Sequence, residues 1–285
     1  MSQQNAYVTA LRRQGRSRWW RSLIAVVLGV LVISLVPLVV TIVSSSLGFA
    51  TDTASPDYPW QLTVRNIGAF VVCLPLLILI NRGLNRLPTR EQVTGAPAWR
   101  WGLALRSLGV ACVAVAVYAV TLFAIEGRLA FAPEPRFALI VALLVLLVPV
   151  QVFTEELLFR GMFMQGLVSA IGVTTVRVLI AVVVSSVIFA ALHGTQSPAM
   201  WASRFGMALI YGYALWRSDG LEVPTALHTA NNLVLLLLAA VTGTFATTFS
   251  NTSVTWVSTS LQLVALGVSC AVALRLAQRR AIKKA

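Results

Sequence analysis

Two adjacent glutamates and the chain's two histidines are the residues best suited to chemistry. The chain has 285 residues, of which nine are acidic and two are histidines. Glu155 and Glu156 lie inside a long apolar run, whereas the other acidic residues lie in or beside polar links, and His193 and His228 also lie in apolar runs. An ionisable group inside a membrane-spanning helix costs several kcal/mol, so it usually faces the bundle interior and serves a function.

Helical spacing separates the two glutamates. Residues four apart share a helix face, so Glu156 and Arg160 are placed to form an ion pair with the acid on the N-terminal side. Glu155 points about 100° away around the helix and has no such local partner. We therefore predict that Glu156 and Arg160 support the site and that Glu155 is free to face a water molecule or a histidine.

The same spacing of four recurs around both histidines. His228 and Asn232 share a helix face, so both can point into one cavity. Phe189 and His193 are also four apart, which lets the aromatic ring form a wall of the site beside the imidazole.

These residue types together suit the attack of water on an amide bond. Burial disfavours the charged form of a carboxylate and makes Glu155 a stronger general base. His193 can hold the water or shuttle its proton. His228 and the Asn232 amide offer two donors for a developing oxyanion.

A metal-dependent reaction is the alternative. Catalytic zinc usually has three protein ligands, which Glu155, His193 and His228 could supply. Against zinc, the sequence has no His-Glu-x-x-His helix, and Asn232 would be a poor zinc ligand. We favour a metal-independent glutamate mechanism without a cofactor and retain a divalent metal such as zinc as the second possibility.

The composition requires that the elements carrying these residues span a membrane. Apolar residues make up 58% of the chain and charged residues 11%, against about 25% charged residues in soluble domains. The net charge of +13 does not indicate nucleic-acid binding, because many of the basic residues flank apolar runs, as in cytoplasmic loops. These flanking clusters are Arg12, Arg13, Arg16, Arg18 and Arg21; Arg82, Arg86, Arg90, Arg100 and Arg106; and Arg275, Arg279, Arg280, Lys283 and Lys284.

The pattern predicts an all-α polytopic membrane protein with about eight transmembrane helices around a polar cavity. An even count puts both termini in the cytoplasm, as the basic clusters require, and we expect the bacterial cell membrane. The spans are predicted at 22–44, 63–81, 105–125, 137–158, 174–193, 199–217, 222–243 and 256–275.

Two features of the predicted spans are irregular. The helical pattern from 136 to 166 is too long for a straight span, and we expect Pro149 and Gly161 to kink or break it. A straight fifth span would also place His193 roughly 30 Å from the cytoplasmic end, whereas His228 would lie only about 10 Å in.

Three motifs resemble the signatures of the CAAX-protease and bacteriocin-processing (Abi) family of intramembrane endopeptidases, which includes the Ras-converting CAAX endopeptidase. They are Glu155-Glu156-x-x-x-Arg160, Phe189-x-x-x-His193 and His228-x-x-x-Asn232, within residues 136–240. The resemblance implies a helical fold with a conical cavity open to the cytoplasm. It also implies water activation by Glu155 with His193, an oxyanion site of His228 with Asn232, and support from Glu156 and Arg160.

We therefore expect an intramembrane endopeptidase that acts on a membrane-associated protein or peptide, with membrane lipids as its other partners and no nucleic acid. The protease core is expected at residues 136–243, after three spans in 1–135 and before the last span and tail in 244–285. A non-catalytic scaffold or bacteriocin-immunity protein of the same fold is the alternative. A proton-coupled transporter is disfavoured, because many transporters contain internal repeats and this sequence shows none.

Overall fold

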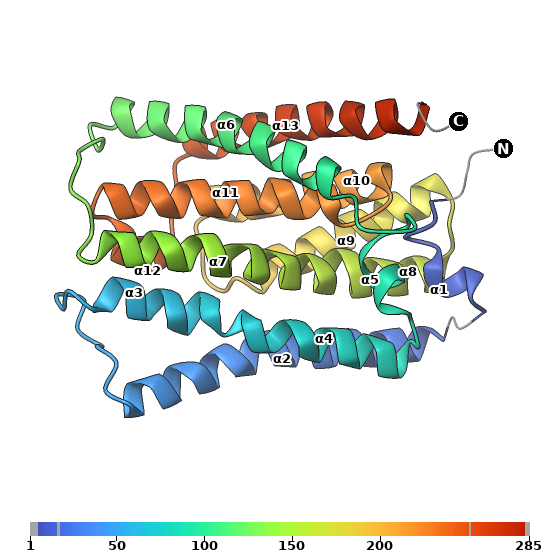
Figure 1. Ribbon diagram of the computed structural model, residues 1–285. Helices are drawn as coiled ribbons and strands as arrows, with labels where there is room; N and C mark the ends of the chain where they lie inside the picture. The colour runs from blue at the N-terminus through green and yellow to red at the C-terminus, as the bar shows by residue number, and fades with distance from the viewer. Residues whose placement is uncertain (1–4, 16–17, 251, 283–285) are drawn as a thin grey trace.

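The computed structural model describes residues 5–15, 18–250 and 252–282, and these residues form helices joined by short links (Figure 1). Two of the long helical segments contain π-helical turns, which are labelled η. The long segments are α2 (Trp19–Ser46), α3 (Tyr58–Thr63) with η1 (Val64–Gly68) and α4 (Phe70–Leu84), α6 (Trp101–Ile125), α7 (Phe137–Glu156) with η2 (Leu157–Phe163) and α8 (Met164–Ile171), α9 (Thr175–Ala191), α10 (Pro198–Ser218), α11 (Glu222–Val241) and α13 (Trp256–Ile282). The short helices are α1 (Ala10–Arg13), α5 (Thr89–Val93) and α12 (Phe245–Ser250).

These segments confirm the predicted all-α membrane fold, since each predicted span overlaps one of them. Within the described residues, six helical segments are long and apolar enough to cross a membrane, and α9 is a shorter apolar helix. The chain is therefore an integral membrane protein. Both termini lie at the same end of the bundle, here called the terminal end (Figure 1). Arg16, Lys283 and Lys284 of the predicted basic flanks lie outside the described residues.

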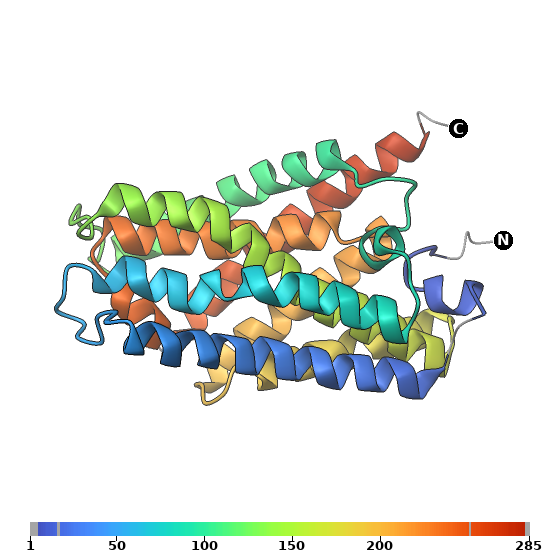
Figure 2. The same ribbon diagram turned by 60° about the horizontal axis from the view of Figure 1, so that its bottom comes forward.

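The bundle has two edges with the site-bearing helices between them. Helices α2 and α4 pack side by side along one edge, and α6 and α13 along the other (Figures 1 and 2). Helices α7 and α11 lie between these edges and contact each other. Small buried residues line the contacts of α6, α11 and α13, among them Ala111, Ala119, Ala230 and Ala273. Small side chains let helix backbones approach closely, which is how helices associate in a membrane.

The predicted irregularity near Gly161 is a π-helical turn, and the helix does not break. Residues 137–171 form one continuous helical run, with Pro149 inside α7 and Gly161 inside η2. The Met164 amide donates to the carbonyl of Phe159, five residues earlier, as in a π-helix. Such π turns occur frequently at functional sites, and this one directly follows the two glutamates.

The segment before α2 packs onto the terminal end of the bundle. Tyr7 is fully buried, and its hydroxyl donates to the carbonyl of Gln92 at 2.7 Å. Its amide donates to Oδ1 of Asp219, also at 2.7 Å. This N-terminal segment was predicted only as a basic flank, and its role in closing this end of the bundle has no signature in the sequence.

Candidate active site

Glu156 forms the buried centre of the polar cluster. It is the last residue of α7 and is fully buried. Its Oε1 lies 3.1 Å from Nη1 of Arg160, which confirms the predicted ion pair. The same oxygen accepts a hydrogen bond from Nδ1 of His228 at 2.8 Å. Glu156 therefore holds the imidazole on α11 as well as the guanidinium on its own helical run.

Aromatic rings pack against the Arg160 guanidinium. Its guanidinium carbon lies 4.6 Å from the centre of the Phe189 ring and 5.5 Å from that of Tyr211. A cation in contact with ring faces is stabilised by their quadrupoles, most strongly where water is excluded. Since Arg160 is buried, these rings and Glu156 together stabilise its charge.

Glu155 points in a different direction from Glu156, as its position on the helix predicted. Its side chain is slightly exposed, and Oε1 accepts a hydrogen bond from Nε2 of Gln151 at 3.1 Å. The other oxygen, Oε2, lies 3.8 Å from Nε2 of His228. The two carboxylates therefore lie beside different nitrogens of the same imidazole, and Glu156 also pairs with the arginine.

The hydrogen bonds of both histidines fix which nitrogen faces the site. A carboxylate and a carbonyl accept hydrogen bonds, so His228 carries a proton on Nδ1 toward Glu156. His193 likewise carries one on Nδ1, which donates to the carbonyl of Phe189 at 2.7 Å. In both rings Nε2 can therefore contact substrate or water or take up a proton. Catalytic histidines are typically held by the other nitrogen in this way.

His193 and His228 both lie beside the Phe189 ring, which resolves the conflict over their depths. The centre of the Phe189 ring is 4.7 Å from that of His193 and 6.0 Å from that of His228. Helix α9 ends at Ala191, and the turn into α10 stops short of the far end of the bundle (Figures 1 and 2). From the sequence, tilted or bent helices and helix ends at different depths were both open, and the structure brings the two histidines to the same aromatic ring.

A cavity of about 240 Å³ gives access to Glu155 and His193. Its remaining walls come from α2, α4, η2 and the end of α9, namely Ile33, Ser34, Phe70, Phe159, Phe189 and Leu192. His193 is exposed at this cavity. The cavity lies between helices of the bundle, as an intramembrane site requires.

Asn232 lies one turn beyond His228 on α11, on the same face. Its Oδ1 accepts a hydrogen bond from Nδ2 of Asn231 at 3.1 Å. The amide nitrogen of Asn232 therefore remains available as a donor.

The zinc ligand set considered from the sequence is only partly assembled. Glu155 and His228 approach each other at 3.8 Å. Within the described residues, no group of three or more His, Cys, Asp or Glu side chains is arranged to hold a metal ion. The residues as placed do not fit a three-ligand zinc site.

Sequence reasoning missed two residues that touch the polar cluster. Tyr211 of α10 stacks on the His228 ring, with centres 4.9 Å apart and planes 23° apart. Gln151 of α7 donates to Glu155. Gln151 lies four residues before Glu155, so helical spacing could have found it. Tyr211 comes from a helix without any recognised motif, and only tertiary structure places it there.

The comparison with known families agrees with the three motifs. Residues 136–234 match a family model described as type II CAAX prenyl endopeptidase Rce1-like. The match supports the resemblance inferred from the motifs, and the matched segment carries every residue of the predicted site. No curated protein and no solved structure matches the chain.

Proposed function

Because residues 136–234 carry the Rce1-like family match, we propose that this membrane protein is an endopeptidase that cleaves its substrate by water attack within the membrane. One observation carries the proposal. Glu155 lines a cavity that also exposes His193, and it faces Nε2 of His228 at 3.8 Å. A carboxylate that lines a cavity together with one imidazole, and that has a second, buried imidazole beside it, forms a general acid–base site.

In this mechanism Glu155 is the general base. A water molecule hydrogen-bonded to Glu155 and to Nε2 of His193 attacks the carbonyl carbon of the scissile peptide bond. Its proton passes to Glu155 as the new C–O bond forms. The bond to nitrogen then breaks, and Glu155 returns the proton to the leaving amine, so the enzyme is regenerated.

His228 and Asn232 stabilise the negative oxygen of the tetrahedral intermediate. With Nδ1 held by Glu156, a protonated His228 presents its Nε2–H as one donor. The Asn232 amide supplies the second donor. The ion pair of Glu156 with Arg160 keeps the imidazole oriented and limits the net charge around it.

The position of the cavity favours a substrate that is held at the membrane. Helix α2 forms part of its wall and presents exposed apolar residues such as Leu31 and Leu35 on its other faces. We propose that a lipid-modified or membrane-anchored peptide enters between α2 and α9, and that both termini of the protein lie in the cytoplasm, where their basic residues belong.

Cleavage of a farnesylated peptide tests this function. The purified protein is reconstituted in liposomes with a quenched fluorescent peptide that ends in a farnesyl-cysteine CAAX sequence, alongside the same peptide without the farnesyl group. We expect cleavage of the farnesylated peptide, and its loss in Glu155→Gln, His193→Ala and His228→Ala. Glu126→Gln, in the link after α6, is the matched control and retains turnover.

The alternative, a non-catalytic scaffold, makes the opposite prediction. If the peptide is not cleaved, peptides that accumulate in native membranes containing wild-type or Glu155→Gln protein are compared by mass spectrometry. Full turnover by Glu155→Gln would refute the glutamate mechanism. An identical peptide profile and cellular phenotype for the two proteins would favour the scaffold.

A further inference from the structure

A chain of buried hydrogen bonds links α10 and α13 to Asn232. The Ser203 hydroxyl donates to Oε1 of Gln262 at 2.6 Å. Nε2 of Gln262 donates to Oδ1 of Asn231 at 2.8 Å, and Nδ2 of Asn231 donates to Oδ1 of Asn232 at 3.1 Å. Ser203, Gln262 and Asn231 are all buried.

Every hydrogen bond in this chain is donated in the same direction, from Ser203 toward Asn232. Each amide accepts on its oxygen from one neighbour and donates from its nitrogen to the next. Because Asn231 donates to the oxygen of Asn232, the nitrogen of Asn232 is left for other partners. Reversal of any one amide alone would set two donors or two acceptors against each other, so the chain couples the orientation of the Asn232 amide to those of Asn231 and Gln262.

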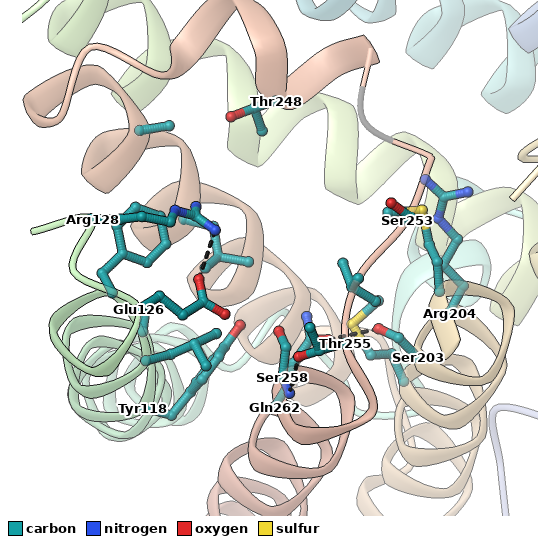
Figure 3. Close-up of a pocket in the computed structure, with 18 residues that line it drawn as sticks. Tyr118, Glu126, Arg128, Ser203, Arg204, Thr248, Ser253, Thr255, Ser258 and Gln262 are labelled. Carbon is teal, nitrogen blue, oxygen red and sulfur yellow. Dashed lines mark hydrogen bonds and ion pairs between the residues drawn. The ribbon is translucent and has the colours of Figure 1, made fainter. Parts of the chain in front are cut away.

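Gln262 is the central member of this chain and lies outside residues 136–234, which match the family. Next to it on α13, Thr259 donates to the carbonyl of Ala199 at 3.0 Å and anchors α13 to α10. Ser203 and Gln262 also line a cavity of about 470 Å³ between α6, α10, α11 and α13, and Figure 3 shows the hydrogen bond between them.

We infer that Gln262, through Asn231, is a positioning residue that turns the Asn232 amide nitrogen toward the reacting carbonyl. This inference rests on the proposed endopeptidase function. It assigns to α13 a part in transition-state stabilisation. The competing explanation is that these amides only satisfy one another and hold α13 in place, since buried polar groups need partners wherever they lie.

Two substitutions at Gln262 separate these explanations. Gln262→Met has a similar shape but neither donates nor accepts strongly, so Asn231 and Asn232 lose their fixed orientation. Loss of one oxyanion donor lowers kcat by about 10²–10³-fold, and we expect about 10²-fold here with KM unchanged. Ser269→Ala is the matched control, because Ser269 is a buried polar residue of α13 that bonds within its own helix.

Gln262→Glu adds a pH readout that a purely structural role would not give. A protonated carboxyl accepts from Ser203 and donates to Asn231 as the amide does, so activity is retained at low pH. Once it ionises, both oxygens accept, so Asn231 turns its nitrogen toward them and its oxygen toward Asn232. We therefore expect kcat of this variant, relative to wild type, to fall by about 10²-fold as pH rises.

The experiment measures kcat and KM with the farnesylated peptide for wild type, the two Gln262 variants, Asn232→Ala, the double variant Gln262→Met/Asn232→Ala and Ser269→Ala. If Gln262 acts through Asn232, the double variant is no slower than Asn232→Ala. Multiplied losses, or an unchanged kcat in Gln262→Met, would overturn the inference while leaving the endopeptidase function intact. Cleavage that survives Glu155→Gln would instead overturn both.

A second measurement does not depend on turnover, so it tests the inference whether or not the protein cleaves this peptide. With ¹⁵N-labelled asparagine, the side-chain amide signals of Asn232, identified by their loss in Asn232→Ala, are recorded in nanodiscs. We expect them to move in Gln262→Met and to stay in place in Ser269→Ala. Unmoved signals in Gln262→Met would show that the chain does not orient Asn232.

Discussion

Exchange of each adjacent glutamate for glutamine should separate stability from catalysis. Glu156 is fully buried, and one of its oxygens is shared by Arg160 at 3.1 Å and His228 at 2.8 Å. Glu155 is slightly exposed and has one neutral hydrogen bond, from Gln151. Glutamine is nearly isosteric with glutamate, so each substitution removes a charge without creating a cavity.

The expected losses follow from these contacts. Removal of one partner of a buried ion pair costs about 3–5 kcal/mol, because the other charge is left uncompensated. Glu156→Gln keeps an amide oxygen as acceptor, so we expect the lower end, about 3 kcal/mol. Glu155→Gln keeps its bond with Gln151 and should cost less than about 1 kcal/mol.

The two variants should rank in the opposite order for turnover. Glu155→Gln removes the base and should abolish cleavage. In Glu156→Gln the amide oxygen can still accept from Nδ1 of His228, but a neutral acceptor stabilises a cationic imidazole less, by roughly 1.5 kcal/mol. That difference lowers kcat about tenfold in the folded fraction.

The assay combines chemical denaturation in detergent micelles with peptide cleavage at a temperature where both variants remain folded. Glu126→Gln is again the control for loss of a carboxylate outside the site. Equal free energies of unfolding for Glu155→Gln and Glu156→Gln would refute the assignment of Glu156 to the buried ion pair. A more active Glu155→Gln than Glu156→Gln would refute the assignment of the base.

Three further outcomes are expected. Tyr7→Phe leaves the buried carbonyl of Gln92 without its donor and should lower the free energy of unfolding by about 1–3 kcal/mol, measured by denaturation. Burial raises the pKa of Asp219, so the folded state favours its protonated form and loses that contribution as pH rises through the raised value. Asp219→Asn keeps an acceptor for the Tyr7 amide and suits the positive φ of 59°, so it should raise the melting temperature at pH 7 and flatten its dependence on pH above 4. Purified protein should contain substoichiometric zinc and should keep its activity in a chelator; stoichiometric metal that is lost together with activity would support the metal-dependent alternative.

Much of the site could be predicted from the sequence because it depends on spacing within single helices. The pairing of Glu156 with Arg160 and the divergence of Glu155 follow from residue positions around one helix. The rarity of these residue types also carried information, since the chain has only two histidines and Glu155 and Glu156 are its only adjacent pair of acidic residues. The spans could be located from hydropathy and length, because a helix that crosses the membrane needs about 20 consecutive, predominantly apolar residues.

Contacts between helices could not be predicted, because no local pattern encodes them. The Nδ1 bond from His228 to Glu156 joins residues 72 apart in the chain, and Gln262 reaches Asn231 from another helix. The sequence around His228 or Gln262 does not indicate which residue of another helix is its partner. Their partners follow only from how α7, α11 and α13 pack.

The depth of His193 is the clearest case in which packing decides the site, and the π turn η2 explains it. Ser185 donates to the carbonyl of Phe159 in η2 at 2.9 Å, which fixes the position of α9 along the bundle. Phe189, one turn further, packs edge-on against Phe159 with centres 5.1 Å apart, and His193 follows after another turn. Because Ser185 and Phe189 lie one turn apart on one face of α9 and His193 follows just past its end, the anchor in η2 fixes the position of His193 along the bundle. Glu155 lies in the same helical run, just before η2. The π turn therefore positions both the proposed base and His193. An estimate that follows α9 as a straight helix from its first residue does not include this contact.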